Sequence, residues 1–438
     1  MNATVRGLTA ACLLALAGLP VSVRGQALTL RQVLARVVTH NPQLAEARLG
    51  LDASDRSVLS AWGKRLPRLS TDASFTRRQD PLPYIPAPSP TVPAHFSDEF
   101  AAWSGVLTLP LYQGGQLATN VALARVRRDI QGLALAQTRN ELLANTVNAY
   151  NKLLQLVRLR DAIRASTAAL EEQVKNARLL YAVERIARVD LLKVEVQLAN
   201  EQQRLLALDE GVSTAGATLT YLMGDAPSAG TPVIALADSL AMPDSSSVFV
   251  AGERRDWTQR PEYRAASSGV RVAQLNQRSA LGKFLPSLSG IGGYTRQYGY
   301  RPVYADGNWF VGFQASLPLR DGSLFADLSR EQVLQRQAKE RLRAVDNQLG
   351  LELTNALTSL RESAHRVTTA HRVIEQARES FRIEQLKYGS GAGTVSDLLL
   401  AQAAAATAEA NLSQALFDYN AALVSYHKAT GTMEEYVK

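Results

Sequence analysis

The segment Trp309-Phe310-Val311-Gly312-Phe313-Gln314-Ala315-Ser316-Leu317-Pro318-Leu319 decides the fold. Apolar and small or polar side chains alternate along it, which predicts a β-strand with one apolar face. Its length is close to the roughly 9–11 residues that a membrane-spanning strand requires. No proline follows Pro318, so the strand is expected to lead into a helix. The apolar set is Trp309, Val311, Phe313, Ala315, Leu317 and Leu319.

The same pattern occurs earlier, at residues 103–111, where Trp103, Leu107 and Leu109 alternate with smaller or polar side chains. Residues 68–78 and 286–297 are weaker strand candidates, rich in Ser, Thr, Gly and Tyr. Apolar-out, polar-in alternation with aromatic residues near the ends is typical of membrane β-barrels. The sequence therefore predicts four strands, near 68–78, 101–111, 286–297 and 308–319.

The landmarks of the chain occur twice at equal spacings, which predicts a tandem duplication. The first structural repeat covers residues 26–224, the inter-repeat linker 225–259, and the second repeat 260–438. The repeats differ mainly at the proline-rich residues 81–90, which we expect to form a loop. The paired landmarks are Pro42–Pro67 and Pro261–Pro286 (25 residues each), Tyr181–Asp190 and Tyr388–Asp397 (9 each), and Asp190–Gly224 and Asp397–Gly431 (34 each).

Two long stretches, 111–226 and 319–438, contain no proline. Because proline costs roughly 3 kcal/mol inside a helix, these stretches predict unusually long helices, and residues 116–180 alone would span on the order of 100 Å. Each helix is expected to fold back at a Tyr-to-Asp segment, as at residues 388–397 with its three glycines. An ordinary soluble bundle is the alternative. Apolar seams with 3/4 spacing are Leu143, Val147, Tyr150, Leu154 and Val157, and Ala405, Ala408, Leu412, Ala415, Tyr419, Ala422 and Tyr426.

The amino terminus has the layout of a secretory signal peptide. Arg6 precedes an uncharged apolar stretch, Leu8–Leu19, and cleavage is expected after Gly25 or Ala27. The alternative is a buried amino-terminal helix. The only cysteine, Cys12, lies in this segment, so disulfides and cysteine metal sites are not expected in the mature chain.

The net charge of +8 falls to +6 when Arg6 and Arg24 leave with residues 1–25. These charges are dispersed, and export further disfavours nucleic acid as a partner. No later segment has about 18 uncharged apolar residues, so no transmembrane helix is expected. Four strands cannot close a sheet, and open edges in lipid leave backbone groups unsatisfied. Three copies of the chain would supply 12 strands.

Four motifs carry a resemblance to the TolC-like outer membrane efflux proteins over nearly the whole mature chain. The resemblance implies a mainly α fold, in which a long α-helical barrel crosses the periplasm and a 12-stranded trimeric β-barrel lies in the outer membrane lipid. It also implies a periplasmic membrane-fusion adaptor and an inner-membrane transporter of the RND or ABC type as partners. The motifs are Leu28–Leu34 followed by Asn41-Pro42, Leu66–Leu69, Leu109–Gly115 and Val189–Ala199.

The resemblance also assigns roles to residues near the expected hairpin tips. Asp397 matches an acidic ring that constricts the periplasmic pore mouth, and Leu400 stands where some relatives have a second acidic ring. Asp190 matches a residue that hydrogen-bonds the tip tyrosine, here Tyr388, and holds the mouth closed. The alternative for Asp397 is that it only caps its helix.

Adaptor docking is expected at the two tips, Ala182–Val189 and Gly389–Ser396. Two departures from the relatives matter here: Glu184 stands where glycine is usual, and Gly393 stands where some relatives have an arginine lock. The docking candidates are Glu184, Arg185, Gly389, Gly391 and Gly393.

The function expected from the resemblance is a passive exit duct for small toxic compounds in a tripartite efflux pump. The same architecture would serve type I protein secretion, and a periplasmic coiled-coil adaptor is a further alternative, although it would not need the alternating strands. The five histidines are scattered and no nucleophile motif is present. The sequence therefore predicts neither an enzyme nor a cofactor or metal site.

Overall fold

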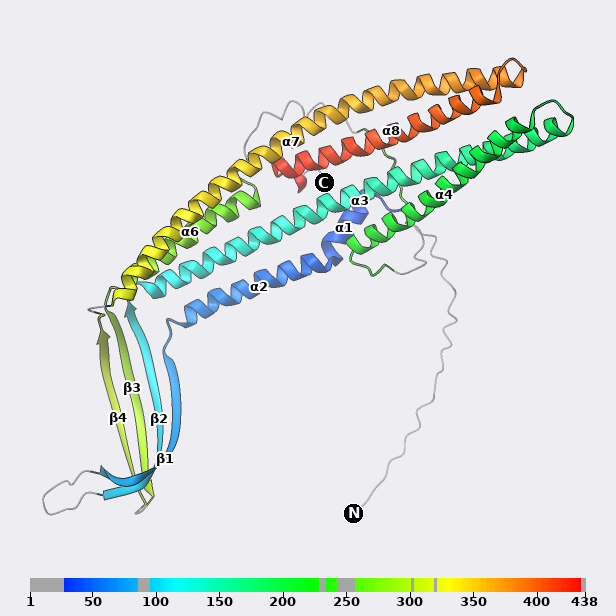
Figure 1. The fold of residues 1–438 in the computed structure, drawn as a ribbon. Coiled ribbons are helices and arrows are strands. Elements are labelled where there is room, and N and C mark those ends of the chain that lie inside the picture. Colours follow the sequence, from blue (N-terminus) through cyan, green and yellow to red (C-terminus); the bar gives the residue numbers. More distant parts are fainter. Residues whose placement is uncertain are drawn as a thin grey trace, which may run out of the picture.

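The computed structural model describes residues 27–85, 95–227, 234–242, 257–300, 303–318 and 321–434. The expected signal peptide, residues 1–25, lies outside these residues. Long helices run side by side in a curved bundle, and a β-sheet continues from one end of it (Figure 1). Across the described part of the chain, no helix has the length and apolar character needed to cross a bilayer.

Two helices are far longer than a compact domain requires, as the proline-free stretches predicted. Helix α3 has 67 residues and α7 has 68, and each folds back into a shorter partner, α4 or α8. The described helices are α1 (Leu30–His40), α2 (Pro42–Gly63), α3 (Gln116–Ala182), α4 (Arg188–Leu222), α6 (Pro261–Gly282), α7 (Gly322–Gly389) and α8 (Val395–Thr430).

Local chemistry fixes where the shorter helices begin. Thr29 forms a capping box with Gln32 at the start of α1. The Asn41 side chain accepts a hydrogen bond from the Gln43 backbone N–H, and Pro42 occupies the first turn of α2. Such caps satisfy amide groups that the first helical turn leaves free. The chain therefore turns at Asn41 without breaking the path of the bundle.

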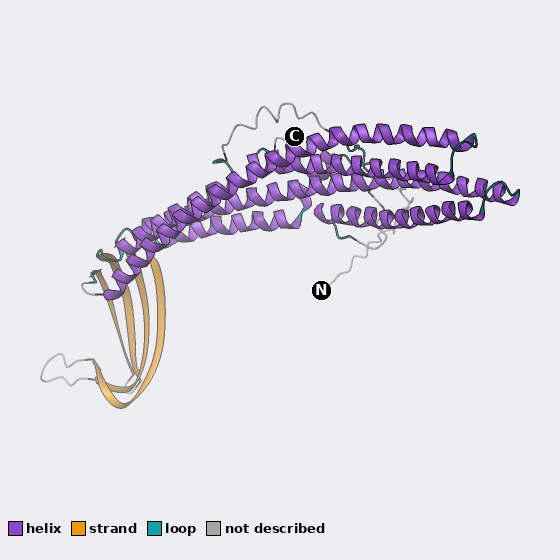
Figure 2. Ribbon diagram, turned by 45° about the horizontal axis from the view of Figure 1, so that its top comes forward, coloured by secondary structure: helices purple, strands orange, loops and turns teal. Residues whose placement is uncertain are grey.

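The four described strands form one antiparallel sheet in the order β1-β2-β3-β4. The sheet projects from the end of the bundle where α2 and α6 finish and α3 and α7 start (Figure 2). The strands are β1 (Arg68–Ile85), β2 (His95–Gln113), β3 (Ser287–Tyr300) and β4 (Val303–Ser316).

The register gathers the predicted apolar set on one face of this sheet. Leu107 pairs with Leu69 on β1 and with Gly292 on β3, and Gly292 pairs with Val311 on β4. The rings of Trp103 and Tyr294 lie 6.2 Å apart on the same face. Trp309, Val311 and Phe313 are each more than three-quarters exposed, which is the pattern of side chains that face an apolar medium.

Strand β1 is longer than predicted, and the expected loop at 81–90 is wrong in part. Residues 81–85 belong to β1, where Leu82 pairs with Ser97 and Pro83 with Phe96 after a register shift. Proline is tolerated there because β1 is an edge strand. One side of β1 has no partner strand in the described chain, so the N–H that proline lacks breaks no hydrogen bond on that side. Residues 86–94 lie outside the described part.

The core follows the helical seams that the sequence predicted. Val147, Tyr150 and Tyr419 are at most 1% exposed, and they pack between α3, α8 and α1. The Tyr150 hydroxyl lies 2.7 Å from an Asp238 carboxylate oxygen and 3.0 Å from the Leu28 carbonyl. Burial, followed by the hydrogen bond to Asp238 and the charge of that carboxylate, raises the pKa of Tyr150. The segment preceding α1 and part of the linker are thereby fastened to the middle of the bundle.

The order helix–strand–strand–long helix–short helix occurs twice, and one junction is built the same way in both occurrences. The Asn41 side-chain amide donates to the Leu222 carbonyl at the end of α4, and the Arg260 guanidinium reaches the Ala429 carbonyl at the end of α8. Each residue immediately precedes the proline that opens its helix. A tandem duplication would produce such a correspondence. The duplication itself stays a prediction.

Candidate functional site

Two hairpin tips lie at the end of the bundle away from the sheet (Figure 1). The residues that the resemblance assigned to the pore mouth and to docking lie in these tips or within about one helical turn of them. Both tips use the same backbone hydrogen bonds. At the first, Glu184 N donates to Tyr181 O and Arg185 N to Leu180 O, and at the second, Gly391 N donates to Tyr388 O and Ala392 N to Lys387 O. This is a Schellman motif, which ends a helix with a left-handed residue.

The left-handed position is a glycine in only one tip. Gly391 has φ of 78°, and Glu184 has φ of 60° although it carries a Cβ. Glutamate is unfavourable in this conformation, whereas glycine adopts it freely. Having Glu184 where relatives usually have glycine therefore raises the conformational free energy of the turn but leaves its geometry the same.

The predicted docking residues occupy the surface of these tips. Glu184, Arg185, Gly389 and Gly391 are exposed, and Gly393 is partly buried. A Cβ at Gly393 would lie 3.0 Å from the Lys387 Cβ, so this glycine lets the chain pass closely over the end of α7. The structure places these residues where a partner could reach them, and docking itself remains a prediction.

Tyr388 and Asp190, the predicted closure pair, lie close together within one chain. Tyr388 is half-buried against a small apolar cluster contributed by both hairpins. Burial, followed by the charge of Asp190, raises the pKa of Tyr388. The cluster residues are Leu170, Val174, Val194 and Val395. The tyrosine and the carboxylate therefore lie near enough to interact through charge, where hairpin α3–α4 contacts hairpin α7–α8, and the hydrogen bond between them stays a prediction.

Lys193 is a functional candidate that the sequence reasoning missed. Its Nζ lies 3.3 Å from Asp190 Oδ1 and 2.9 Å from Ser396 Oγ, so one ammonium connects α4 with the first turn of α8. The i,i+3 spacing from Asp190 was visible in the sequence. Its contact with Ser396, 203 residues away, was not.

Asp397 and Leu400 lie one helical turn apart on the exposed side of α8. The Thr394 hydroxyl donates to Asp397 Oδ2 at 2.7 Å, and Asp397 N donates to Thr394 Oγ1 at 3.1 Å. Thr394 is therefore the N-cap, and the Asp397 carboxylate supports that cap while remaining exposed. Leu400 is 72% exposed and belongs to none of the apolar clusters formed by the described residues.

Lys387 adds a positive charge beside this turn. Its Nζ lies 2.6 Å from Glu384 Oε1, and Glu384, followed by Asp397, raises the pKa of Lys387. The tips thus carry acids and bases in close succession on exposed surfaces. Such an arrangement suits contacts that form and break, because exposed ion pairs contribute little to stability.

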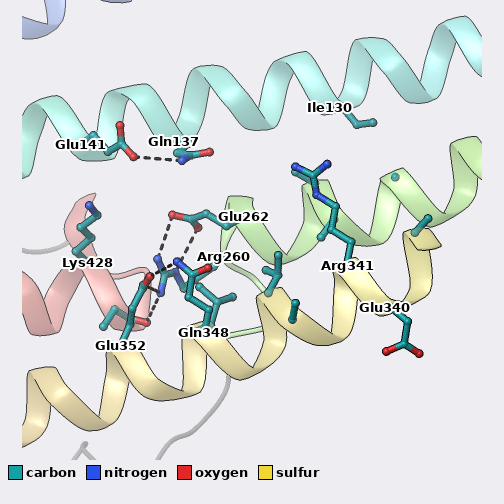
Figure 3. Close-up of a pocket in the computed structure, with 18 of the residues that line it drawn as sticks. Ile130, Gln137, Glu141, Arg260, Glu262, Glu340, Arg341, Gln348, Glu352 and Lys428 are labelled. Carbon is teal, nitrogen blue, oxygen red and sulfur yellow. Dashed lines mark hydrogen bonds and ion pairs between the residues drawn. The ribbon is translucent and has the colours of Figure 1, made fainter. Parts of the chain in front are cut away.

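A hollow of about 1310 Å³ lies between α3, α6, α7 and the end of α8 (Figure 3). Arg260, only 3% exposed, reaches into its wall and pairs with Glu262 and Glu352 at 3.0 Å each. Its remaining bond goes to the Ala429 carbonyl. Because these three partners belong to α6, α7 and α8, Arg260 fastens the three helices together. Among the described residues, no group of three or more metal-ligating side chains is present.

The family model described as outer membrane efflux protein matches residues 33–225 and 257–432. The outer membrane efflux protein BepC of Brucella suis biovar 1 (strain 1330) is 25% identical over 418 residues, which cover 92% of this chain and 86% of BepC. The outer membrane protein TolC of Salmonella enteritidis is 24% identical over 435 residues, covering 94% and 84%. The outer membrane protein VceC of Vibrio cholerae has the same fold, with a TM-score of 0.75 at 18% identity, covering 92% of this chain and 96% of VceC.

Proposed function

Because this chain belongs to the outer membrane efflux protein family, we propose that it is the exit duct of a tripartite efflux pump. In this proposal the chain is a passive, non-enzymatic channel for small toxic compounds. A periplasmic membrane-fusion adaptor connects it to an inner-membrane transporter of the RND or ABC type, which supplies the energy. Outer membrane location and efflux are properties of the family, and the proposal adds the cargo, the adaptor and the transporter.

The proposed assembly is a homotrimer. One described chain provides a four-stranded sheet with two free edges, and a sheet in lipid must close on itself. Three copies supply 12 strands, which is within the range of known membrane barrels. The helices of 67 and 68 residues then extend on the order of 100 Å into the periplasm.

The observation that carries the proposal is the contact between the two hairpin tips. At one end of the molecule an apolar-faced sheet suits lipid, and at the far end Lys193 joins Asp190 to Ser396 beside the half-buried Tyr388. A duct needs a mouth that can close and reopen. Polar contacts between rigid hairpins supply such a closure without a large apolar interface to separate.

We assign Asp397 and Leu400 to the constriction of this mouth. Three Asp397 carboxylates around the trimer axis would attract cations and repel anions. Three Leu400 side chains, one helical turn further along α8, would form an apolar ring that narrows the pore. The adaptor would dock on the exposed tips, with Glu184 and Arg185 at one tip and Gly389, Gly391 and Gly393 at the other.

The experiment that tests the channel and its constriction is conductance in planar bilayers. We expect purified protein to form discrete channels, and Asp397→Ala to raise conductance and reduce cation preference. Thr394→Val is the matched control, because it removes the hydroxyl that caps α8 but keeps the carboxylate.

Equal effects of the two substitutions would mean that Asp397 acts only as part of the helix cap. Absence of any channel would contradict the duct itself.

Deleting the gene and measuring sensitivity to a compound panel tests the cargo. Unchanged tolerance together with the loss of a secreted protein would favour type I secretion instead.

A further inference from the structure

Two guanidinium groups share one indole ring where α2 leads into the sheet. Arg65 Cζ lies 4.8 Å from the centroid of the Trp62 ring, and Arg125 Cζ lies 5.6 Å from it. Trp62 and Arg65 come from the end of α2 and the turn after it, and Arg125 comes from α3. Guanidinium groups are attracted to the electron-rich faces of tryptophan. We call this group of three residues the Trp62 site.

The two cations of the Trp62 site lack a carboxylate partner within the described part of the chain. Another arginine on α3 is paired: Arg128 Nε lies 2.9 Å from Asp55 Oδ1. The corresponding end of the second repeat is also neutralised, since Lys283 Nζ lies 2.9 Å from Asp327 Oδ2. Two uncompensated positive charges on one ring create a local positive potential that an anion would relieve.

Apolar side chains continue from the Trp62 site onto the sheet. Leu66 is 64% exposed and Leu69 is 75% exposed. Leu69 pairs with Leu107 and so belongs to the apolar face of the sheet. A tryptophan with basic residues on one side and exposed leucines on the other matches the border between lipid headgroups and acyl chains.

The Trp62 site is expected to stay open when chains assemble. Leu281 precedes Pro286 by five residues, as Trp62 precedes Pro67. Helix α6 is flanked on both sides, by α3 and α7, yet Leu281 is 48% exposed. Arg125 is likewise exposed on α3, which is flanked by α2 and α6. Neighbouring helices therefore do not cover these positions.

We propose that the Trp62 site binds the phosphate headgroup of an anionic phospholipid. The proposal rests on the outer membrane function proposed above, which puts the junction of helices and sheet at the periplasmic surface of that membrane. Both guanidiniums donate to the phosphate oxygens, which they suit through their planar donor geometry. The acyl chains lie along Leu66, Leu69 and the apolar face. The phosphate thus supplies the negative charge that no carboxylate of the described residues provides to Arg65 and Arg125.

The test is a lipid titration of the purified detergent-solubilised protein, followed by native mass spectrometry. Phosphatidylglycerol is compared with phosphatidylcholine of the same acyl chains. We expect phosphatidylglycerol to bind the wild type preferentially. The double variant Arg65→Gln/Arg125→Gln should bind it on the order of twenty-fold more weakly, at roughly five-fold for each charge near a headgroup.

Two matched controls remove one positive charge without touching the indole. Lys64→Gln alters the adjacent residue, and Lys283→Gln alters the corresponding end of the second repeat, where the cation is already paired. Lys64→Gln should reduce phosphatidylglycerol affinity by no more than the roughly five-fold of a single charge, and Lys283→Gln by less than about two-fold because its charge is already paired with Asp327. An equal loss in the controls would show non-specific charge attraction and overturn the site.

The other outcomes also decide. Unchanged phosphatidylglycerol binding in the double variant overturns the proposal. If the double variant no longer assembles when phosphatidylcholine is the sole lipid, the two arginines pair with a neighbouring copy of the chain. That result also overturns the proposal. Conductance of the same samples in neutral bilayers tests the duct separately, so failure of the duct and failure of the lipid site give different results.

Discussion

At the scale of single residues, the two tips show how one backbone geometry is reached with different side chains. Glu184 and Gly391 occupy the same position in the same hydrogen-bonded turn, with φ of 60° and 78°. Only the glycine does so without steric cost. The first tip therefore keeps its conformation at the expense of local stability. In the proposed docking, its exposed glutamate would offer a charge at a position where the second tip has glycine.

Exchanging these residues should move the stability of the two tips in opposite directions. Glu184→Gly should stabilise the α3–α4 tip, and Gly391→Glu should destabilise the α7–α8 tip, each by about 1 kcal/mol. Amide hydrogen exchange at the tips measures this as a roughly five-fold change in local opening. Faster exchange in Glu184→Gly would mean that the glutamate side chain stabilises its turn in some way other than through the backbone.

At the scale of elements, the hairpins are held together by a few polar contacts along their length. Midway, Glu409 on α8 accepts hydrogen bonds from Arg158 on α3 and from Arg378 on α7. At the tips, Lys193 provides the one charged link between the hairpins that the described residues make, through Asp190 and Ser396. The hairpins are therefore anchored near their middle and lightly fastened at their ends, which is the arrangement that a hinged mouth requires.

Removing the link at the tips should loosen the mouth. Lys193→Met takes away both hydrogen bonds but keeps a long apolar stem, so we expect larger single-channel conductance with little change in thermal stability. Lys175→Met is the control, because within the described part of the chain Lys175 pairs with Glu172 on its own helix and with no other acid. Conductance that rises equally in both variants would remove Lys193 from the closure.

Arg260 should have the opposite profile, with a large effect on stability. Arg260→Met leaves Glu262, Glu352 and the Ala429 carbonyl without their shared partner, and we expect a loss of about 3 kcal/mol in the free energy of unfolding. Urea unfolding followed by circular dichroism measures it. Arg366→Met, which breaks exposed pairs with Glu362 and Asp418, should have little effect. Equal losses would show that burial of Arg260 does not matter.

The elements were largely predictable because their signals are local. The absence of proline fixed the lengths of α3 and α7, and alternation placed Trp103, Leu107 and Val311 on one face of the sheet. Contacts between elements were not predictable. The bond between Lys193 and Ser396 depends on how two hairpins pack, and the extension of β1 to Ile85 depends on its being an edge strand.

At the scale of the whole molecule, a single chain has two unfinished sides. Helix α3 is flanked by helices of its own chain on both sides, whereas α7 on one margin and α2 with α4 on the other lack an outer neighbour. Both margins expose leucines: Leu351 on α7 is 61% exposed, and Leu206 on α4 is 69% exposed. Contact between the margins of adjacent copies would bury this surface, as the proposed trimer requires.

A charge placed on one margin should therefore weaken the assembly. We expect detergent-solubilised wild type to have the mass of three chains by light scattering, and Leu351→Lys to shift it toward one chain, because an unpaired ammonium would be buried at the interface. Leu179→Lys is the control, since Leu179 is 68% exposed on α3, which already has neighbours on both sides. A wild-type particle of one chain would contradict the trimer.

The uninterrupted course of α3 and α7 limits how this molecule can evolve. An α-helix turns by about 100° per residue, so inserting one residue midway would rotate every side chain beyond it away from its partners. Shortening one arm of a hairpin would likewise slide it against the other. Changes in reach must therefore be made in whole turns and in all parallel segments together, which makes the distance from lipid to tip one of the least adjustable properties of the protein.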